Sequence, residues 1–299
     1  MIPVIVNATS GLGHSDAALE DLRRLFREAG AESEVFPARD GGHLQELVRA
    51  AMKRSPSILV VGGGDGTVSS VAQLTRGTST ALGVLPMGTL NHFARDMGLP
   101  VELPDAVKVA VTGRRVAIDM GEVNGSAFLN NASIGLYPDL VRDRQRQQRR
   151  LGRSKRAAML WAILAVMRRT PKVHIRVEVD GKPLEINAPF VFVGNNEYLM
   201  EGFQIGQRAS LEDGELSVYT TRRRTAGELF RLALRALFLR LHQADDFIAT
   251  AARRLTVESR HKRLLVATDG EVRSMDLPLV FRCLPRTLLV MAPQAEAAA

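Results

Sequence analysis

Cysteine, long apolar runs and metal-ligand patterns are nearly missing from this sequence, and each shortage excludes a class of protein. Cys283 is the only cysteine among 299 residues, so an internal disulfide or a thiolate metal cluster is excluded and a reducing compartment is expected. The histidines lack metal-ligand spacing, which argues against a zinc site. The longest apolar run, 157–167, is far shorter than the roughly 20 residues of a membrane-spanning helix. The N-terminus lacks the charged and apolar segments of a secretory signal.

The composition is that of a folded globular protein. Hydrophobic residues make up 45% of the chain and charged residues 24%, which excludes disorder or a fibrous repeat as its main character. The formal net charge is +8, which favours an anionic partner. Residues 142–156 carry seven arginines and one lysine against Asp143, so this segment accounts for most of the excess. Two interpretations stay open: a solvated loop, or a patch for anionic lipid headgroups, where each basic residue contributes roughly 1 kcal/mol.

The order of predicted elements indicates two domains. Early in the chain, apolar strands alternate with amphipathic helices, which is typical of an α/β domain with a mostly parallel sheet and helices on both faces. We expect these strands at 2–6, 58–61 and 81–85, and these helices at 15–29, 43–53, 67–76 and 90–97. After about residue 114 the pattern favours a β-rich, largely antiparallel domain with inserted helices at 155–168 and 225–242.

These patterns also predict the domain limits. The α/β domain is placed at 1–118, and a strand at 286–293 could complete its sheet. The β-rich domain is placed at 119–285, and a disordered tail at 294–299.

The most informative segment is a glycine-rich turn between a buried strand and a helix. Residues 62–67 read GGGDGT. Glycines let backbone N–H groups approach an anion without interference from a Cβ atom, and the N-terminus of the following helix adds partial positive charge. The spacing matches neither the dinucleotide fingerprint nor the Walker A loop. The segment therefore predicts a phosphate site of another type.

Two further loops follow predicted strands. In residues 86–91 (PMGTLN), Thr89 is placed to cap the next helix or to bond a phosphate oxygen, and Asn91 is expected in the first helical turn. Residues 7–11 (NATSG) follow the first strand. Because ligands of α/β sheets lie at the carboxyl ends of the strands, three such loops favour a nucleotide site.

These motifs together resemble the bacterial diacylglycerol kinase family of soluble lipid kinases. The matching segments, in the order of that family, are 7–11, 62–67, 85–100, 118–141, 190–218 and 268–271, so they extend over nearly the whole chain. The resemblance implies an α/β domain of the NAD kinase and diacylglycerol kinase type, a β-rich domain, and an active site in the cleft between the domains. It also implies ATP and Mg²⁺ as cofactors and a diacylglycerol-like lipid alcohol as the acceptor.

The resemblance further implies the site residues. Those that match ATP-binding positions are Asn7, Ala8, Thr9, Ser10, Gly11, Gly63, Gly64, Asp65, Gly66, Thr67, Val68, Ser69 and Thr89, to which we add Asn91 of the same loop. Glu271 matches the proton acceptor, and Ser210, Asp213 and Glu215 match a magnesium-binding turn.

The chemistry of these acids also follows from the residues themselves. A carboxylate such as Glu271 can accept the proton of an attacking hydroxyl group. Asp65, Asp119 and Asp269 are further acids that we expect near metal or water, with Asp65 and Asp269 as candidate catalytic groups. Alternatives stay open: Asp269-Gly270 and Asp213-Gly214 also fit simple turns, and Asp119 also fits a capping role.

Three functions compete. The first is an ATP- and Mg²⁺-dependent lipid kinase, cytoplasmic and peripherally attached to the inner face of the membrane through 142–156, with an oligomer left open. The second is an NAD kinase, which shares GGDGT but is not expected to carry the segment MGTLNHFARDMGLP. The third is a nucleic-acid-binding protein that uses 142–156. Because that segment lacks interleaved aromatic residues and the phosphate loops would stay unexplained, no nucleic acid partner is expected.

Overall fold

A computed structural model of the chain describes most of its residues in two compact units. Unit 1 comprises Met1–Met120 with Pro285–Ala299, and unit 2 comprises Gly121–Leu284. The described residues are 1–7, 15–135, 175–179, 182–186, 190–199, 207–208, 210–220, 248–259 and 261–294. Outside them lie residues 8–11 of the first loop, the basic segment 142–156, the predicted helices 155–168 and 225–242, and 295–299 of the predicted tail.

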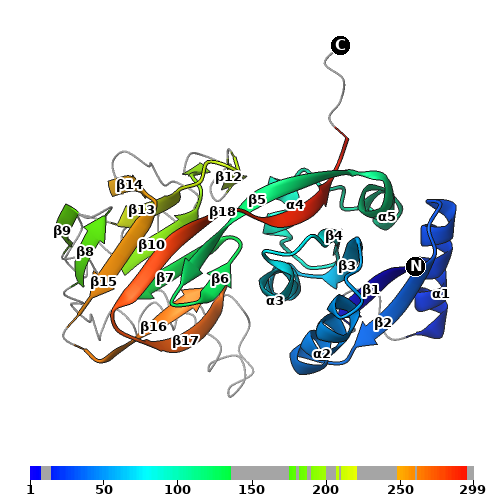
Figure 1. Cartoon of the computed structure of the whole chain (residues 1–299), viewed down its shortest axis with the longest axis horizontal. Coiled ribbons are helices and arrows are strands. Elements are labelled where there is room, and N and C mark those ends of the chain that lie inside the picture. Colours follow the sequence, from blue (N-terminus) through cyan, green and yellow to red (C-terminus); the bar gives the residue numbers. More distant parts are fainter. Residues whose placement is uncertain are drawn as a thin grey trace, which may run out of the picture. The chain divides into compact units, whose positions relative to one another are not determined.

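Unit 1 is built on a parallel sheet with the strand order β2-β1-β3-β4-β18 (Figure 1). The strands are β1 (Ile2–Asn7), β2 (Ser33–Ala38), β3 (Ile58–Gly63), β4 (Ala81–Pro86) and β18 (Leu279–Ala292). The last strand joins the sheet where Val290 pairs with Leu82. Strands β1, β3 and β4 are nearly continuous runs of buried apolar residues, as expected for a sheet that helices cover on both faces.

Two pairs of helices supply that cover. Helix α1 (Asp16–Glu28) packs against α5 (Leu103–Thr112), and α2 (Gly41–Met52) packs against α3 (Asp65–Thr75). The core on the α1 and α5 side consists of Val4, Val6, Leu19, Leu22, Phe26, Val35, Val60, Leu85, Ala106, Val107 and Ala110. The predicted parallel α/β fold of the N-terminal part is confirmed.

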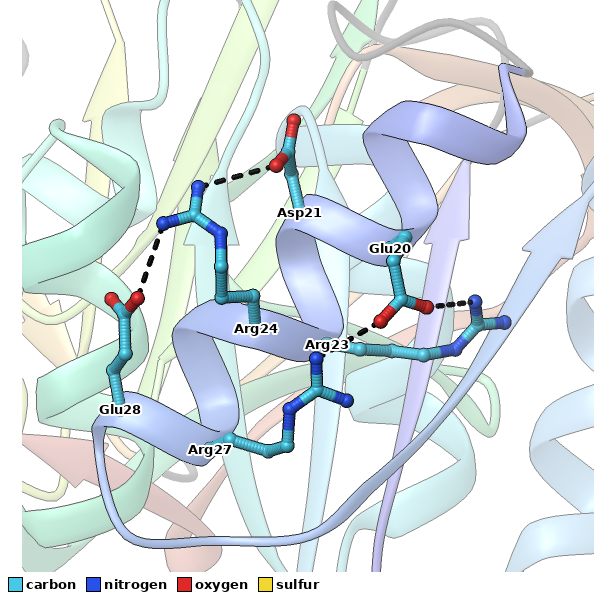
Figure 2. A network of polar contacts seen from close by, with 6 residues as sticks. All are labelled: Glu20, Asp21, Arg23, Arg24, Arg27 and Glu28. Atoms are coloured by element: carbon cyan, nitrogen blue, oxygen red, sulfur yellow. Dashed lines mark hydrogen bonds and ion pairs between the residues drawn. The ribbon is translucent and has the colours of Figure 1, made fainter.

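The exposed face of α1 carries a network of ion pairs. Figure 2 shows its six members, Glu20, Asp21, Arg23, Arg24, Arg27 and Glu28. Glu20 accepts hydrogen bonds from Arg27 at 2.9 Å and from Arg23 at 3.2 Å, and these bonds lower the pKa of its carboxyl group. Because water screens these exposed charges, the network adds little to the stability that the apolar face of α1 provides.

Two elements of unit 1 lie where no strand or helix was expected, and a third is shorter than predicted. Strand β2 contains Pro37, which the sheet tolerates because β2 lies at its edge. Helix α5 begins with Pro104 in its first turn and ends at Gly113. The helix expected at 90–97 is α4 (His92–Asp96), which starts two residues later.

Unit 2 is antiparallel throughout its main sheet, as predicted for the C-terminal domain. The strand order of this sheet is β14-β13-β10-β7-β16-β17. Its strands are β7 (Asn131–Gly135), β10 (Phe190–Asn195), β13 (Leu216–Thr220), β14 (Ile248–Ala252), β16 (Arg263–Thr268) and β17 (Glu271–Asp276).

A second antiparallel layer continues from the part of β18 that belongs to unit 2. Its order is β18-β15-β8-β9, with β15 (Arg254–Glu258), β8 (Ile175–Val179) and β9 (Lys182–Ile186). The end of β5 (Arg114–Val123) forms a hairpin with β6 (Ser126–Phe128), and β11 (Tyr198–Leu199) pairs with β12 (Gln207–Arg208). Buried residues of both layers, including Val193, Val266, Leu255 and Phe281, share one core.

Aromatic residues occupy the other side of the main sheet. Phe192 lies edge-on to Tyr198 and Tyr219, with ring centroids 5.6 Å and 6.0 Å apart. The Tyr219 hydroxyl accepts a hydrogen bond from the Tyr198 N–H at 3.0 Å and donates one to the Tyr198 carbonyl at 3.2 Å. Burial raises the pKa of this hydroxyl group, so it stays protonated and holds the chain just beyond β10.

In the part of the chain that the structure describes, no helix combines the length and apolar character needed to cross a membrane.

Candidate functional site

Three predicted loops of unit 1 start from strands that end at the same edge of the sheet. Strands β1, β3 and β4 are parallel neighbours, with Val6 paired to Gly62 and Gly63 paired to Pro86. At the end of β1, Asn7 donates a hydrogen bond from Nδ2 to Oγ1 of Thr67 at 3.0 Å. This contact joins the first loop to the first turn of α3. The predicted ATP-binding residues Ala8, Thr9, Ser10 and Gly11 lie outside the described residues.

The glycine-rich turn leads directly into helix α3. Gly64 occupies the N-cap position in an extended conformation, and no side chain of the described residues caps the helix. The Gly64 carbonyl accepts hydrogen bonds from Thr67 N–H and Val68 N–H at 2.9 and 3.1 Å. The first N–H groups of a helix have no partner within it, and together with the helix dipole they favour an anion. Gly66 is exposed, and among the described residues nothing would lie within 4 Å of a Cβ atom there.

The loop that follows β3 and the loop that follows β4 touch through their backbones. Met87 N–H donates to the Gly63 carbonyl at 3.0 Å. A Cβ atom on Gly88 would lie 2.5 Å from the Gly64 Cα atom, and one on Gly63 would lie 2.6 Å from Thr67. Neither position therefore has room for a side chain. Gly88 was not among the predicted site residues, although glycines in the loops after two adjacent parallel strands are the signal that identifies this contact.

Asp65 connects the two loops through its side chain. Its Oδ1 atom accepts a hydrogen bond from Phe93 N–H at 3.0 Å, and Phe93 is the second residue of α4. A carboxylate in this place satisfies an N–H group that the helix leaves unpaired and complements the helix dipole. One predicted catalytic residue thus has a structural partner.

We expect Asp65→Ala to destabilise unit 1 by about 1 kcal/mol and Asp65→Asn to cost less, because asparagine keeps an oxygen acceptor for Phe93 N–H. Urea unfolding of the full-length protein measures both changes. If both variants lose the same free energy of unfolding, this hydrogen bond has no role in stability, and the negative charge of Asp65 alone accounts for the loss.

In the second loop, the structure excludes one of the two roles left open for Thr89 and corrects the placement of Asn91. Thr89 does not cap the helix: α4 begins at His92, with Asn91 at the N-cap, and Thr89 is exposed. Asn91 is not in the first helical turn but precedes it in a left-handed conformation, with φ of 49°. Its side chain instead closes the loop, because Oδ1 accepts from Gly88 N–H at 2.9 Å and Nδ2 donates to the Gly88 carbonyl at 3.0 Å.

The buried acid Asp119 also has a structural partner. It lies on β5 with no exposed surface, and its Oδ1 atom accepts a hydrogen bond from Arg286 N–H at 2.8 Å. Arg286 has a φ of 52°, so this bond supports a left-handed backbone position within β18. The capping role that the sequence left open for Asp119 is confirmed.

In unit 2, Asp269 and Gly270 form the turn between β16 and β17. Both have left-handed backbones, with φ of 47° and 83°. The Asp269 carboxylate accepts three backbone hydrogen bonds, from Leu129 N–H at 2.8 Å, Asn130 N–H at 2.8 Å and Asn131 N–H at 3.1 Å. Glu271 follows as the first residue of β17, and its half-exposed carboxylate pairs with Arg273 at 2.8 Å.

The predicted magnesium turn lies between β12 and β13. Ser210 Oγ accepts from Glu212 N–H at 3.1 Å, and the Glu215 carbonyl accepts from Asn196 N–H at 3.0 Å. Asp213 is exposed, and among the described residues it makes no ion pair. Within the described ranges, no group of three or more His, Cys, Asp or Glu side chains could hold a metal ion by itself.

Comparison with known proteins places the whole chain among lipid kinases. Residues 1–123 match the family model "Diacylglycerol kinase catalytic domain", and residues 139–292 match "YegS C-terminal NAD kinase beta sandwich-like domain". The chain is 30% identical to a diacylglycerol kinase of Bacillus subtilis over 98% of its own length and 97% of that protein. It is 31% identical to a probable lipid kinase YegS of Salmonella arizonae over 79% of its length and 78% of that protein.

The fold has a counterpart among solved structures. A crystal structure of a diacylglycerol kinase from Bacillus anthracis aligns with 97% of this chain and 96% of its own, with a TM-score of 0.68 and 18% identity. At that identity the likeness supports the fold, which agrees with the α/β and antiparallel units described above.

Proposed function

The chain belongs to the diacylglycerol kinase and YegS family of lipid kinases, and we propose that it transfers the γ-phosphoryl group of ATP to the hydroxyl group of diacylglycerol or a similar lipid alcohol. The observation that carries this proposal is the N-terminus of α3, which follows the glycine turn, has no side-chain cap among the described residues and lies against the Gly88 loop. Both loops start from adjacent parallel strands, where α/β sheets bind nucleotides.

In this proposal the backbone of the glycine turn binds the phosphates of ATP. Glycines let an anion approach the backbone N–H groups, Gly66 is the exposed residue of this turn, and Asn7 holds Thr67 in place. The resemblance of the chain to its family supports the same assignment for Val68, Ser69 and Thr89, and for residues 8–11. Asn91 acts indirectly, since its side chain shapes the Gly88 loop.

Glu271 is the proposed acceptor of the proton that the lipid hydroxyl loses as it attacks the γ-phosphorus. Its carboxylate is half-exposed, and a carboxylate within hydrogen-bond reach of a hydroxyl group can act as a general base. Asp269 is better suited to hold this turn, because its carboxylate already accepts three backbone hydrogen bonds.

The turn with Ser210, Asp213 and Glu215 fits Mg²⁺. This ion prefers oxygen ligands, keeps several waters and needs only one or two carboxylates beside the substrate phosphates. The exposed carboxylate of Asp213 and the oxygens of its turn provide such ligands. When bound, Mg²⁺ neutralises negative charge on the phosphate oxygens, which is the main electrostatic requirement of phosphoryl transfer.

An assay with γ-labelled ATP tests the proposal. The purified protein should label diacylglycerol or a related lipid alcohol in mixed micelles, and EDTA should remove this activity. A panel that includes monoacylglycerol, ceramide and NAD identifies the acceptor. Labelling of NAD without any lipid would contradict the proposal and favour the NAD kinase alternative.

We also propose that the basic segment 142–156 attaches the enzyme to an anionic membrane, where a lipid acceptor lies. Binding to anionic vesicles should weaken when its eight basic residues are replaced by glutamine, and also at high salt. Unchanged vesicle binding would refute this attachment.

A further inference from the structure

One peptide group in unit 2 is held at both ends by side chains of opposite charge. Leu129 and Asn130 link β6 to β7, and the carbonyl of Leu129 and the N–H of Asn130 belong to the same amide. Arg208 donates from Nη1 to the Leu129 carbonyl at 2.7 Å. On the other end of that amide, Asn130 N–H donates to Asp269 Oδ1 at 2.8 Å. The amide therefore bridges a guanidinium group and a carboxylate.

The environment of this bridge strengthens it. Arg208 is buried, with 7% of its surface exposed, and its guanidinium lies 5.8 Å from the centre of the Tyr198 ring. It also donates from Nη2 to Oδ1 of Asn130 at 3.0 Å, while Asn195 Nδ2 donates to the Leu129 carbonyl at 2.9 Å. Hydrogen bonds with charged partners are the stronger ones, and linked bonds polarise one another in a medium of low dielectric constant.

The bridge ends at the turn that carries the proposed base. The two other N–H groups bound by Asp269 are those of Leu129 and Asn131, so its carboxylate is fixed against residues 129–131. Asp269 and Gly270 make the left-handed turn, and Glu271 comes directly after it. On the other side, the predicted magnesium turn begins at Ser210, two residues after Arg208 in the chain.

We propose that Arg208 is a positioning residue for phosphoryl transfer, which acts through the Leu129–Asn130 amide and Asp269 on the placement of Glu271. This inference rests on the proposed function. Arg208 was not among the predicted site residues, and no local pattern marks it, because its partners Leu129 and Asn130 are 79 and 78 residues away in the chain.

The test compares Arg208→Met, Arg208→Lys and Asp269→Asn with a matched control, Arg263→Met. Arg263 is half-exposed on β16 of the same unit and pairs with Asp276 at 3.1 Å, so its replacement removes an arginine without touching the amide. We expect Arg208→Met and Asp269→Asn to lower kcat for the lipid by about 10- to 100-fold, because a small displacement of a catalytic group has effects of this size. The KM for ATP should stay near its wild-type value, and the control should keep its kcat.

Two further results separate positioning from a general loss of structure. Arg208→Lys should recover part of kcat, since lysine can donate to the Leu129 carbonyl but cannot also reach Asn130 in the planar geometry of arginine. In the double variant Arg208→Met/Asp269→Asn, kcat should fall by less than the product of the two single fold-losses, because both residues act on one amide. Folded single variants with wild-type kcat would overturn the inference.

An NMR measurement keeps the inference testable apart from activity. In the labelled full-length protein, hydrogen exchange at Asn130 N–H should quicken in Arg208→Met, although Arg208 is not the partner of that N–H, and should stay unchanged in Arg263→Met. Unchanged exchange in Arg208→Met would refute the bridge. A wild-type protein without lipid kinase activity would refute the proposed function, while this exchange result would still decide whether the bridge exists.

Discussion

Gly88→Ala should remove most ATP binding while the protein stays folded. The new Cβ atom would lie 2.5 Å from the Gly64 Cα atom and 2.7 Å from Asn91 Oδ1. The first of these neighbours is backbone and cannot rotate away, so the two loops must separate. Overpacking of this kind costs about 1–3 kcal/mol, which corresponds to roughly 5- to 150-fold in an affinity. Isothermal titration with ATP and Mg²⁺ measures the loss.

Two other glycines supply controls for this result. Gly41, at the start of α2, has open space around it and no left-handed backbone, so Gly41→Ala should bind ATP as the wild type does. In Gly66→Ala the new Cβ atom would also meet no described residue within 4 Å, but it would lie beside the backbone of the glycine turn. This variant should keep wild-type stability and lose ATP affinity if a phosphate binds that backbone. Wild-type ATP affinity in Gly88→Ala would show that the contact between the loops does not shape the nucleotide site.

The elements that could be predicted are those whose signal lies within a few neighbouring residues. Strand β3 is an apolar run that ends in glycines, and α1 combines a Ser15 cap with an apolar face. Strand β2 was missed because Glu34 and Pro37 interrupt its apolar pattern, and only its place at the edge of the sheet makes them tolerable. Helix α5 is rich in valine, which favours strands, and it is helical because Ala106, Val107 and Ala110 pack on the sheet.

The candidate site shows the same division between local and distant information. The glycine turn and the 269–271 turn are visible in the sequence as short motifs, because their backbone geometry requires glycine. The contacts that organise them are not local: Asp65 meets Phe93, and Asp269 meets three N–H groups about half a chain away. Motifs therefore mark the candidate segments in each unit, whereas only the fold shows that Asp65, Asn91 and Asp269 have structural partners.

Glu271→Gln should lower kcat for phosphoryl transfer by about 100- to 10,000-fold, the range that a general base contributes. Glutamine has nearly the same shape but cannot accept the hydroxyl proton at neutral pH. Stability should change little, because the pair between Glu271 and Arg273 is half-exposed and solvent screens it. The KM for ATP should also change little, since the proposed nucleotide loops belong to unit 1. Steady-state kinetics in mixed micelles measure both constants.

The control for this variant is Glu258→Gln, which changes an exposed glutamate of β15 in the same unit. It should keep the kcat of the wild type, so a loss confined to Glu271→Gln identifies a specific role. Asp269→Asn distinguishes the two acids further. It keeps the Glu271 carboxylate but weakens the hydrogen bonds from Leu129 N–H and Asn130 N–H that fix the 269–271 turn. If Glu271 is the base, Asp269→Asn should retain more activity than Glu271→Gln. The reverse order would make Asp269 the group that accepts the proton, with Glu271 in the supporting role.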